Sequence, residues 1–291
     1  MAVYERTYRS YEGPLTPRRW RFLVLPRYAI EEVFRSKLFL ILPTLGLLWM
    51  IGCCIAVYLP HNSKILATLG EEGSAVAAGL FQFGPRFFLG WVMLPYASLS
   101  LVISMILGPA LVSADLRNNG LPLYLSRPFG RWDYVLGKAT VLFIILSAVT
   151  WIPGLLLFLF QAYLGGTSWL GDNWHIGIAI PVGFLAWIVL LCLLNLAISA
   201  YVKWKPVARI VLLLVCFGTF PLAAVINFNL DTQWANTLNI LLMFNLMVRG
   251  LLGMGAPGSV PLIWAWISLG AFCAFSLLLL SRKLRAYEVV R

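Results

Sequence analysis

Long uncharged, apolar segments alternate with short charged segments along the chain. Crossing the hydrocarbon core as a helix takes about 20 apolar residues. Six segments meet this length: Leu38–Leu59, Phe87–Val112, Ala139–Leu164, Ile176–Val202, Ile210–Leu230 and Ser259–Ser281. Their apolar runs are continuous, whereas a membrane β-barrel needs alternating segments of about ten residues. The pattern therefore predicts an all-α integral membrane protein with six transmembrane helices.

The basic residues fall in every second charged segment. Nineteen of the 22 Lys and Arg residues lie in residues 1–37, 113–138, 203–209 and 282–291. The other three are Lys64, Arg86 and Arg249. Because basic loops are retained on the cytoplasmic side, we expect both termini in the cytoplasm. This gives a cytoplasmic tail with an interface helix (1–37), a transmembrane domain (38–281) and a second cytoplasmic tail (282–291).

The composition narrows the class further. The chain is 61% hydrophobic and only 11% charged, which excludes an ordinary soluble domain of 291 residues. A net charge of +11 would suggest nucleic acid as a partner of a soluble protein. Here the cytoplasmic flanks facing anionic lipid explain it, so we expect membrane lipids and no nucleic acid. The first apolar run begins only at Leu38, so a cleavable signal peptide is not expected.

The five cysteines all lie within predicted spans: Cys53, Cys54, Cys192, Cys216 and Cys273. Their spacing matches no metal-binding pattern, and cysteine in such segments behaves as a small apolar residue. Neither a disulfide framework nor a zinc site is indicated.

An amphipathic pattern precedes the first span. Ala29, Ile30, Val33, Phe34 and Lys37 recur at helical spacing, with Glu31, Glu32 and Arg35 on the other side. This predicts a helix on the cytoplasmic surface, with Glu31, Arg35 and Lys37 as candidate interface residues. The alternative is that the segment extends the first span.

The segment Asp231–Arg249 is apolar but short. Only 17 uncharged residues separate its two charged ends, and a crossing here would place the basic C-terminal tail outside. We therefore expect a re-entrant or interfacial pair of short helices on the outer side, packed between other spans.

Two short turns are predicted between neighbouring spans. An external turn is expected at Gly165, Gly166, Gly171, Asp172 and Asn173, with Trp169 and Trp174 at headgroup level. An internal turn is expected at Lys203–Pro206.

The internal loop 113–138 differs from these turns because it is long and amphipathic. Leucines alternate with polar residues until Arg127-Pro128 interrupts the run. A loop of this length with its own apolar face is typical of a contact surface. The loop holds Asp115, Gly120, Leu123, Leu125-Ser126-Arg127-Pro128, Arg131, Tyr134 and Gly137-Lys138.

These residues make the chain similar to the permease subunits of ABC-2-type ATP-binding-cassette exporters. In that family the loop after the second span runs from an acidic residue to Leu-Ser-x-Pro-x-x-Arg, and then to an aromatic approach ending in Gly-Lys. Six spans, a preceding amphipathic helix and short outer helices before the last span also match. The family's Glu-Gly-Thr-Leu core is replaced here by Asn118-Asn119-Gly120-Leu121-Pro122.

The resemblance implies that the loop is a coupling element seated on a cytoplasmic ATPase subunit. A second permease copy, identical or paralogous, completes the transporter, and ATP and Mg²⁺ bind the partner ATPase. The implied location is the cytoplasmic membrane of a bacterium. The implied coupling residues are Asp115, Arg117, Leu121, Leu125, Arg127, Pro128, Arg131, Tyr134 and Lys138. Alternatively, Arg127, Arg131 and Lys138 only anchor the loop at anionic headgroups.

Several chemistries lack a sequence signal. We find no phosphate-binding P-loop, no Ser/His/Asp grouping and no HExxH, so no catalytic, cofactor-binding or metal residue is proposed and the chain is not expected to be an enzyme. No predicted span has an ionisable residue in its interior, which weighs against a secondary carrier. A carrier or channel-like protein without a motor and a membrane scaffold stay as alternatives.

Four amides lie within the predicted spans: Gln161, Asn195, Asn227 and Asn229. Such groups either join helices through hydrogen bonds or line a translocation path. The transported substrate does not follow from the sequence.

Overall fold

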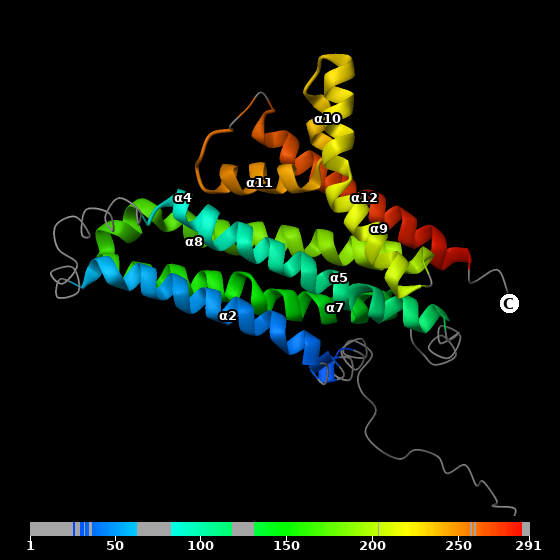
Figure 1. Ribbon diagram of the computed structural model, residues 1–291, viewed down its shortest axis with the longest axis horizontal. Helices are drawn as coiled ribbons and strands as arrows, with labels where there is room; N and C mark the ends of the chain where they lie inside the picture. Colours follow the sequence, from blue (N-terminus) through cyan, green and yellow to red (C-terminus); the bar gives the residue numbers. More distant parts are fainter. Residues whose placement is uncertain are drawn as a thin grey trace, which may run out of the picture.

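The computed structural model describes residues 37–62, 83–117, 131–202, 204–256, 258 and 260–286, together with residues 26, 30, 31, 33 and 34. Side chains of residues 37, 38, 110–117, 131–134 and 284–286 lie outside this description. The regular elements of the described part are all helices, as the sequence predicts (Figure 1).

The helices follow one another in a simple order. They are α2 (Lys37–Tyr58), η2 (Leu59–His61), α4 (Pro85–Phe87), the π-helical η3 (Phe88–Met93), α5 (Leu94–Arg117), α7 (Arg131–Val149), α8 (Trp151–Tyr201), α9 (Lys205–Phe217), α10 (Thr219–Leu230), the 3₁₀ helix η4 (Trp234–Leu238), α11 (Ile240–Leu251) and α12 (Leu262–Ala286).

Five helical stretches of the described residues are long and apolar enough to cross a membrane. They are Phe39–His61, Pro85–Pro109, Val135–Tyr201, Lys205–Leu230 and Leu262–Lys283. Their length and hydropathy make the chain a multi-pass membrane protein.

The third stretch, of 67 residues, folds back on itself. As one straight helix it would be about 100 Å long, against about 30 Å of hydrocarbon. Gly166 breaks it with φ 75° and ψ −176°, a conformation that glycine adopts without steric cost. Gly154 before the break faces Ile180 after it, so the two halves are antiparallel. They correspond to the predicted third and fourth spans.

The predicted external turn between these spans is wrong in its extent. Helix continues through residues 167–173, and only Gly166 departs from helical geometry. Trp169 is not left at a free surface either. Its indole donates a 2.9 Å hydrogen bond to the Phe83 carbonyl, and its ring packs on Phe158. Glycines and polar residues in the sequence mark a weak helix, but a single glycine at positive φ suffices to reverse the chain.

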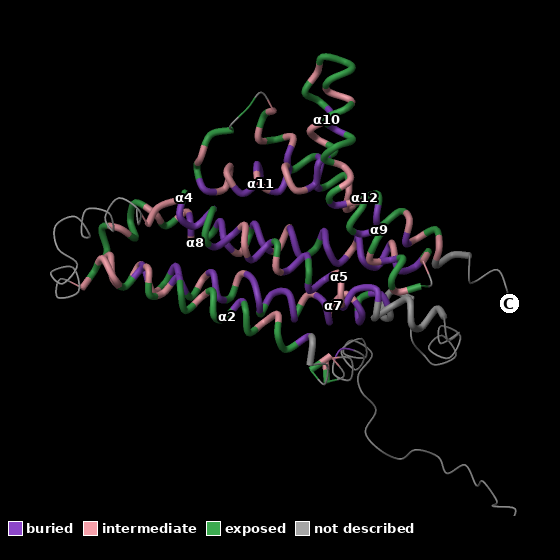
Figure 2. The backbone as a smooth tube through the Cα atoms, in the orientation of Figure 1, coloured by how far each residue is buried: buried purple, intermediate pink, exposed green. Residues whose placement is uncertain are grey.

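Helix α8 is at the centre of the fold (Figure 1). It packs against α5, α7 and α12, and also against α2, α11 and α9. Figure 2 shows buried residues concentrated along α5, α7 and α8, while α2 and α10 are largely exposed. The buried core includes Trp187, Phe184 and Ile188 of α8. A helix that is apolar on all sides is typical of a membrane interior.

The second half of the chain adds a less buried group of helices. The predicted fifth span is bent at Gly218, where α9 ends and α10 begins. Helix α10 extends away from the α5–α7–α8 body in Figure 1, and Ala223 is its one buried residue. In residues 231–251 the structure has the pair of short helices η4 and α11. Helix α11 packs against α8 and α12 through Met243, Phe244 and Met247.

Candidate coupling end of the bundle

The relative direction of α5 and the later part of α8 follows from two contacts. The Trp187 indole donates a 3.0 Å hydrogen bond to the Ser100 hydroxyl. Eight residues further along each helix, Gly108 meets the side chain of Asn195. Equal steps in the same direction mean that the two helices are parallel. Their C-terminal ends, Arg117 and Tyr201, therefore lie at the same end of the bundle.

Helices α7 and α2 both begin at this end. The Cys192 thiol donates to the Ala139 carbonyl at 3.8 Å, near the start of α7 and the end of α8, so these helices are antiparallel. Helix α2 is antiparallel to the η3–α5 helix. The Trp49 indole donates to the Trp91 carbonyl at 2.8 Å and the Tyr96 hydroxyl donates to the Gly46 carbonyl at 3.0 Å, so a step forward in one helix is a step back in the other.

The end of α12 joins the same group. The Tyr201 hydroxyl donates to the Leu279 carbonyl at 3.0 Å. The Lys283 ammonium lies 5.3 Å from the centre of the Tyr201 ring, within the range of a cation–π contact. The starts of α2, α7 and α9 and the ends of α5, α8 and α12 are called the basic end below.

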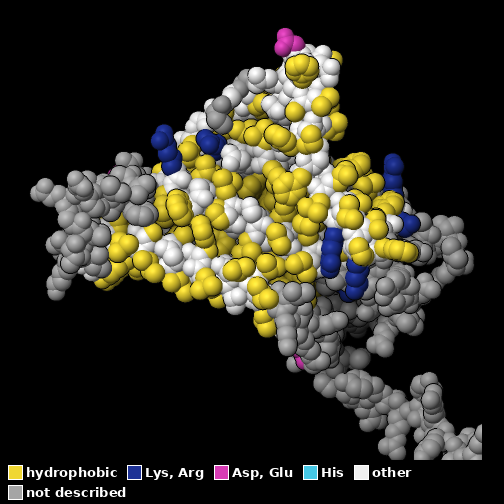
Figure 3. Space-filling model, viewed as in Figure 1, with side chains coloured by type: hydrophobic (Ala, Val, Ile, Leu, Met, Phe, Trp, Pro, Cys, Tyr) yellow, Lys and Arg dark blue, Asp and Glu magenta, His cyan; other side chains and the backbone are white. Residues whose placement is uncertain are grey.

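The charges on the surface follow this arrangement. Figure 3 shows Lys and Arg side chains in two groups separated by a wide apolar area. Lys205, Arg282 and Lys283 belong to the basic end. Arg86, the second residue of α4, lies at the opposite end. The four sequence segments that carry most of the basic residues therefore connect to helix ends at one end of the bundle.

The predicted coupling residues fall into three groups. Asp115 and Arg117 are in the last turn of α5, while Arg131 and Tyr134 are in the first turn of α7. Leu121, Leu125, Arg127 and Pro128 lie outside the described residues. Lys138 is in the second turn of α7, and its side chain is only 8% exposed.

The two helices extend into both ends of the predicted loop 113–138. Residues 113–117 and 131–138 are helical, so α5 and α7 continue well into the charged segment. Charged residues such as Arg and Lys are good helix formers, and a helix does not have to end where its apolar stretch ends. The burial of Lys138 comes from its position in α7 beside the neighbouring helices.

The candidate interface residues are only partly described. Glu31 is helical and exposed, whereas Ile30 and Val33 pack against the core. This sidedness agrees with the amphipathic pattern. Lys37 is the first residue of α2, and Arg35 lies outside the described residues.

The four amides behave differently from one another. The Asn227 amide donates to Asn236 Oδ1 at 2.9 Å and accepts from the Ala235 N–H at 3.1 Å, so it joins α10 to η4. Asn195 and Asn229 each donate to their own helix, to the carbonyls of residues 191 and 225. Gln161 is buried. None of the four lines either of the two cavities described in this chain.

The sequence analysis did not identify Gly108 and Trp187, which both make contacts between helices in the interior. Gly108 is small enough for α5 to approach Asn195, and Trp187 connects α8 to α5 and to Phe244 of α11, with ring centres 4.5 Å apart. A small residue inside an apolar span is a known signal of close helix packing. It would have drawn attention to Gly108 but could not have named its partner.

Comparison of the chain with protein-family models and with curated proteins finds no match. The multi-pass helical architecture thus stands on helix length, hydropathy and the contacts described above.

Proposed function

We propose that this chain is the transmembrane permease subunit of an ABC exporter, with six membrane-spanning helices and both termini in the cytoplasm. The basic end faces the cytoplasm, and residues 231–251 form the short outer helices. ATP and Mg²⁺ bind a separate ATPase subunit, and this chain itself is not an enzyme. Its substrate is unidentified.

The observation that carries the proposal is the pair of helix ends to which the segment with the Leu-Ser-x-Pro-x-x-Arg motif is attached. The last residue of the motif, Arg131, begins α7, and the preceding residues connect back to Arg117 at the end of α5. Both helices pack against α8, which contacts most of the bundle. A force applied to this connection therefore acts on the central helices, as domain-scale switching requires.

The basic end supports the orientation. Lys and Arg near the ends of spans are retained in the cytoplasm, where a soluble ATPase is found. Under the proposal, Arg127 and Arg131 pair with acidic groups of the ATPase, and Asp115 pairs with a basic group. A second copy of this chain or a paralogue completes the transporter.

Co-purification with the candidate ATPase tests this proposal. We expect R127E/R131E to lower recovery of the ATPase and its stimulation at least tenfold. The matched control is R86E, because Arg86 is exposed and lies at the opposite end of the bundle. Unchanged recovery and stimulation in R127E/R131E would remove both arginines from the interface. Transport that continues without any ATPase would overturn the permease assignment in favour of a carrier.

A further inference from the structure

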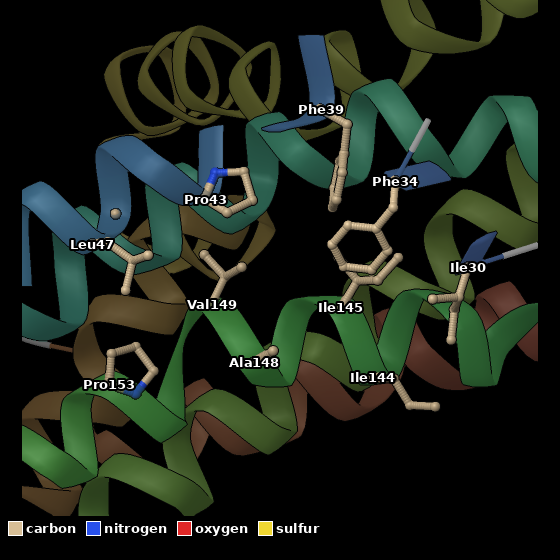
Figure 4. Close-up of a pocket in the computed structure, with 11 residues that line it drawn as sticks. Ile30, Phe34, Phe39, Pro43, Leu47, Ile144, Ile145, Ala148, Val149 and Pro153 are labelled. Carbon is tan, nitrogen blue, oxygen red and sulfur yellow. The ribbon is translucent and has the colours of Figure 1, made fainter. Parts of the chain in front are cut away.

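An apolar groove lies between the beginning of α2 and the α7–α8 junction. It has a volume of about 200 Å³. One wall comes from Phe39, Pro43, Gly46 and Leu47, and the facing wall from Ile144, Ile145, Ala148, Val149 and Pro153, with Ile30 and Phe34 at one end. Figure 4 shows the two walls facing each other. We propose that this groove binds one acyl chain of a membrane phospholipid.

The groove lies where α2 packs mainly against α5 and α8 rather than against α7. At Gly46 an added Cβ would lie 3.7 Å from Val149 Cγ1, so the two walls are close at this point. Phe39, near the start of α2, lies at the end of the groove that is nearer the basic end. There Phe34 packs edge-to-face on Phe39, with ring centres 5.5 Å apart, and forms the end of the groove.

The position of the groove indicates that it faces the lipid of the membrane. It lies beside the exposed face of α2, where the side chains of Ile41, Leu45 and Leu48 are 51–64% exposed. In a membrane-spanning helix such side chains face lipid. Transmembrane helices tilt by about 20° on average, so a groove along α2 runs roughly in the direction of the lipid chains.

The length and depth of the groove suit one leaflet. From Phe39 to Leu47 the α2 wall rises about 12 Å, at 1.5 Å per residue. Half of the hydrocarbon core is about 15 Å. The α2 wall of the groove starts two residues after Lys37, the first residue of α2. A chain lying in it would therefore place its phosphate near the level of the basic end.

The chemistry and size of the groove exclude other occupants. All eleven lining residues are apolar or glycine, so a polar ligand would find no oriented hydrogen-bond partner from these side chains. An engineered apolar cavity of about 150 Å³ binds benzene, so about 200 Å³ holds a hydrocarbon segment. A helix of a second copy is about 10 Å wide, so even two turns of it need more than this volume.

The test uses the full chain expressed in membranes that contain a phospholipid with a diazirine in the middle of one acyl chain. After purification in detergent, which removes loosely held lipid, the sample is illuminated and the labelled peptides are mapped by mass spectrometry. We expect label on residues 39–47 and 144–153 at least fivefold above that on the exposed helix α10. Equal labelling of α10 and the groove would overturn the proposal.

Two variants fill the groove from opposite walls. A148W and L47W should each lower groove labelling at least fivefold. The matched controls are L48W, whose parent residue is exposed beside Leu47 but does not line the groove, and A224W on exposed α10. Groove labelling that is unchanged in both filling variants would contradict acyl-chain binding, and having one variant on each wall guards against the misfolding of either.

Two further arms separate phospholipid from other occupants. Excess unlabelled oleic acid should not lower the labelling of the groove. A loss of labelling would show that the groove takes free fatty acid instead. A disulfide between two copies of L47C would show that a second chain covers the groove. Either result would overturn the proposal, and neither depends on whether the chain is an exporter.

Discussion

Gly108 of α5 and Asn195 of α8 meet so closely that a Cβ at position 108 would collide with the Asn195 amide. Asn195 is 1% exposed and donates to the Leu191 carbonyl at 2.8 Å. Its side chain is therefore held between its own helix and α5. The approach of the two central helices depends on the absence of a side chain at Gly108.

Replacing Gly108 by alanine should destabilise the bundle. Overpacking of a close contact typically costs about 1–3 kcal/mol, and Asn195 has little space to move. We expect G108A to lower the free energy of unfolding by this amount in a detergent titration. The control is G270A in α12, where an added Cβ meets nothing within 4 Å and alanine favours the helix. Equal stability of the two variants would contradict the packing argument.

Trp187 should contribute more through its ring than through its N–H group. It is 1% exposed and packs on Phe244 while donating to Ser100. W187A should lower the free energy of unfolding by about 3–5 kcal/mol. W187F keeps an aromatic ring and should cost about 0.5–1.5 kcal/mol for the lost hydrogen bond. The same titration measures both, and W174A is the control, because Trp174 is 60% exposed. A loss in W187F as large as in W187A would contradict the dominance of packing.

Asn227 should hold η4 against α10. N227A removes two hydrogen bonds, worth about 1–2 kcal/mol together. Amide exchange of residues 234–238 should then accelerate about fivefold to thirtyfold, since 1.4 kcal/mol is a factor of ten. The matched control is N229A, whose amide bonds within its own helix and is exposed. Similar exchange in both variants would show that the Asn227 bonds do not restrain this segment.

Cysteines introduced near the two ends of the second half of α8, which follows the break at Gly166, test the proposed orientation. Trp174 and Trp204 are 60% and 71% exposed, and the 27 residues from 174 to 201 span about 40 Å. In a background with all five native cysteines replaced, a membrane-impermeant maleimide added to intact cells should label W174C. It should label W204C only after the membrane is opened. The reverse pattern would place the basic end outside and remove the basis of the coupling proposal.

The position of the apolar helices could be predicted from the sequence. Four of the six predicted segments start within five residues of the corresponding helix, as Leu38 and Lys37 illustrate. The exceptions are Ala139, because α7 already begins at Arg131, and Ile176, because helix already resumes directly after Gly166. Apolar length marks the part of a helix that suits hydrocarbon, and it does not mark where the helix itself ends. For the same reason, α5 and α7 extend into the predicted coupling loop.

The candidate site could be predicted only in part. The charge pattern indicated which segments belong together, and the structure brings the helix ends attached to them to one end of the bundle. The charge pattern gave no sign that Lys138 is buried, because the burial of this side chain depends on the helices beside α7. The charge pattern also gave no sign of the groove between Phe39 and Ala148, because its walls come from segments that are far apart in the sequence.

The sequence by itself determined that this is a helical, multi-span membrane protein with its basic residues concentrated in alternate segments. Both follow from local rules, since backbone in hydrocarbon must satisfy its own hydrogen bonds and charge is costly there. Tertiary structure alone decided the reversal at Gly166, the meeting of Gly108 with Asn195 and the groove beside α2. In a segment that is apolar on all sides, hydropathy does not distinguish the face that packs on another helix from the face that meets lipid. That choice depends on the shapes of the surfaces that come together.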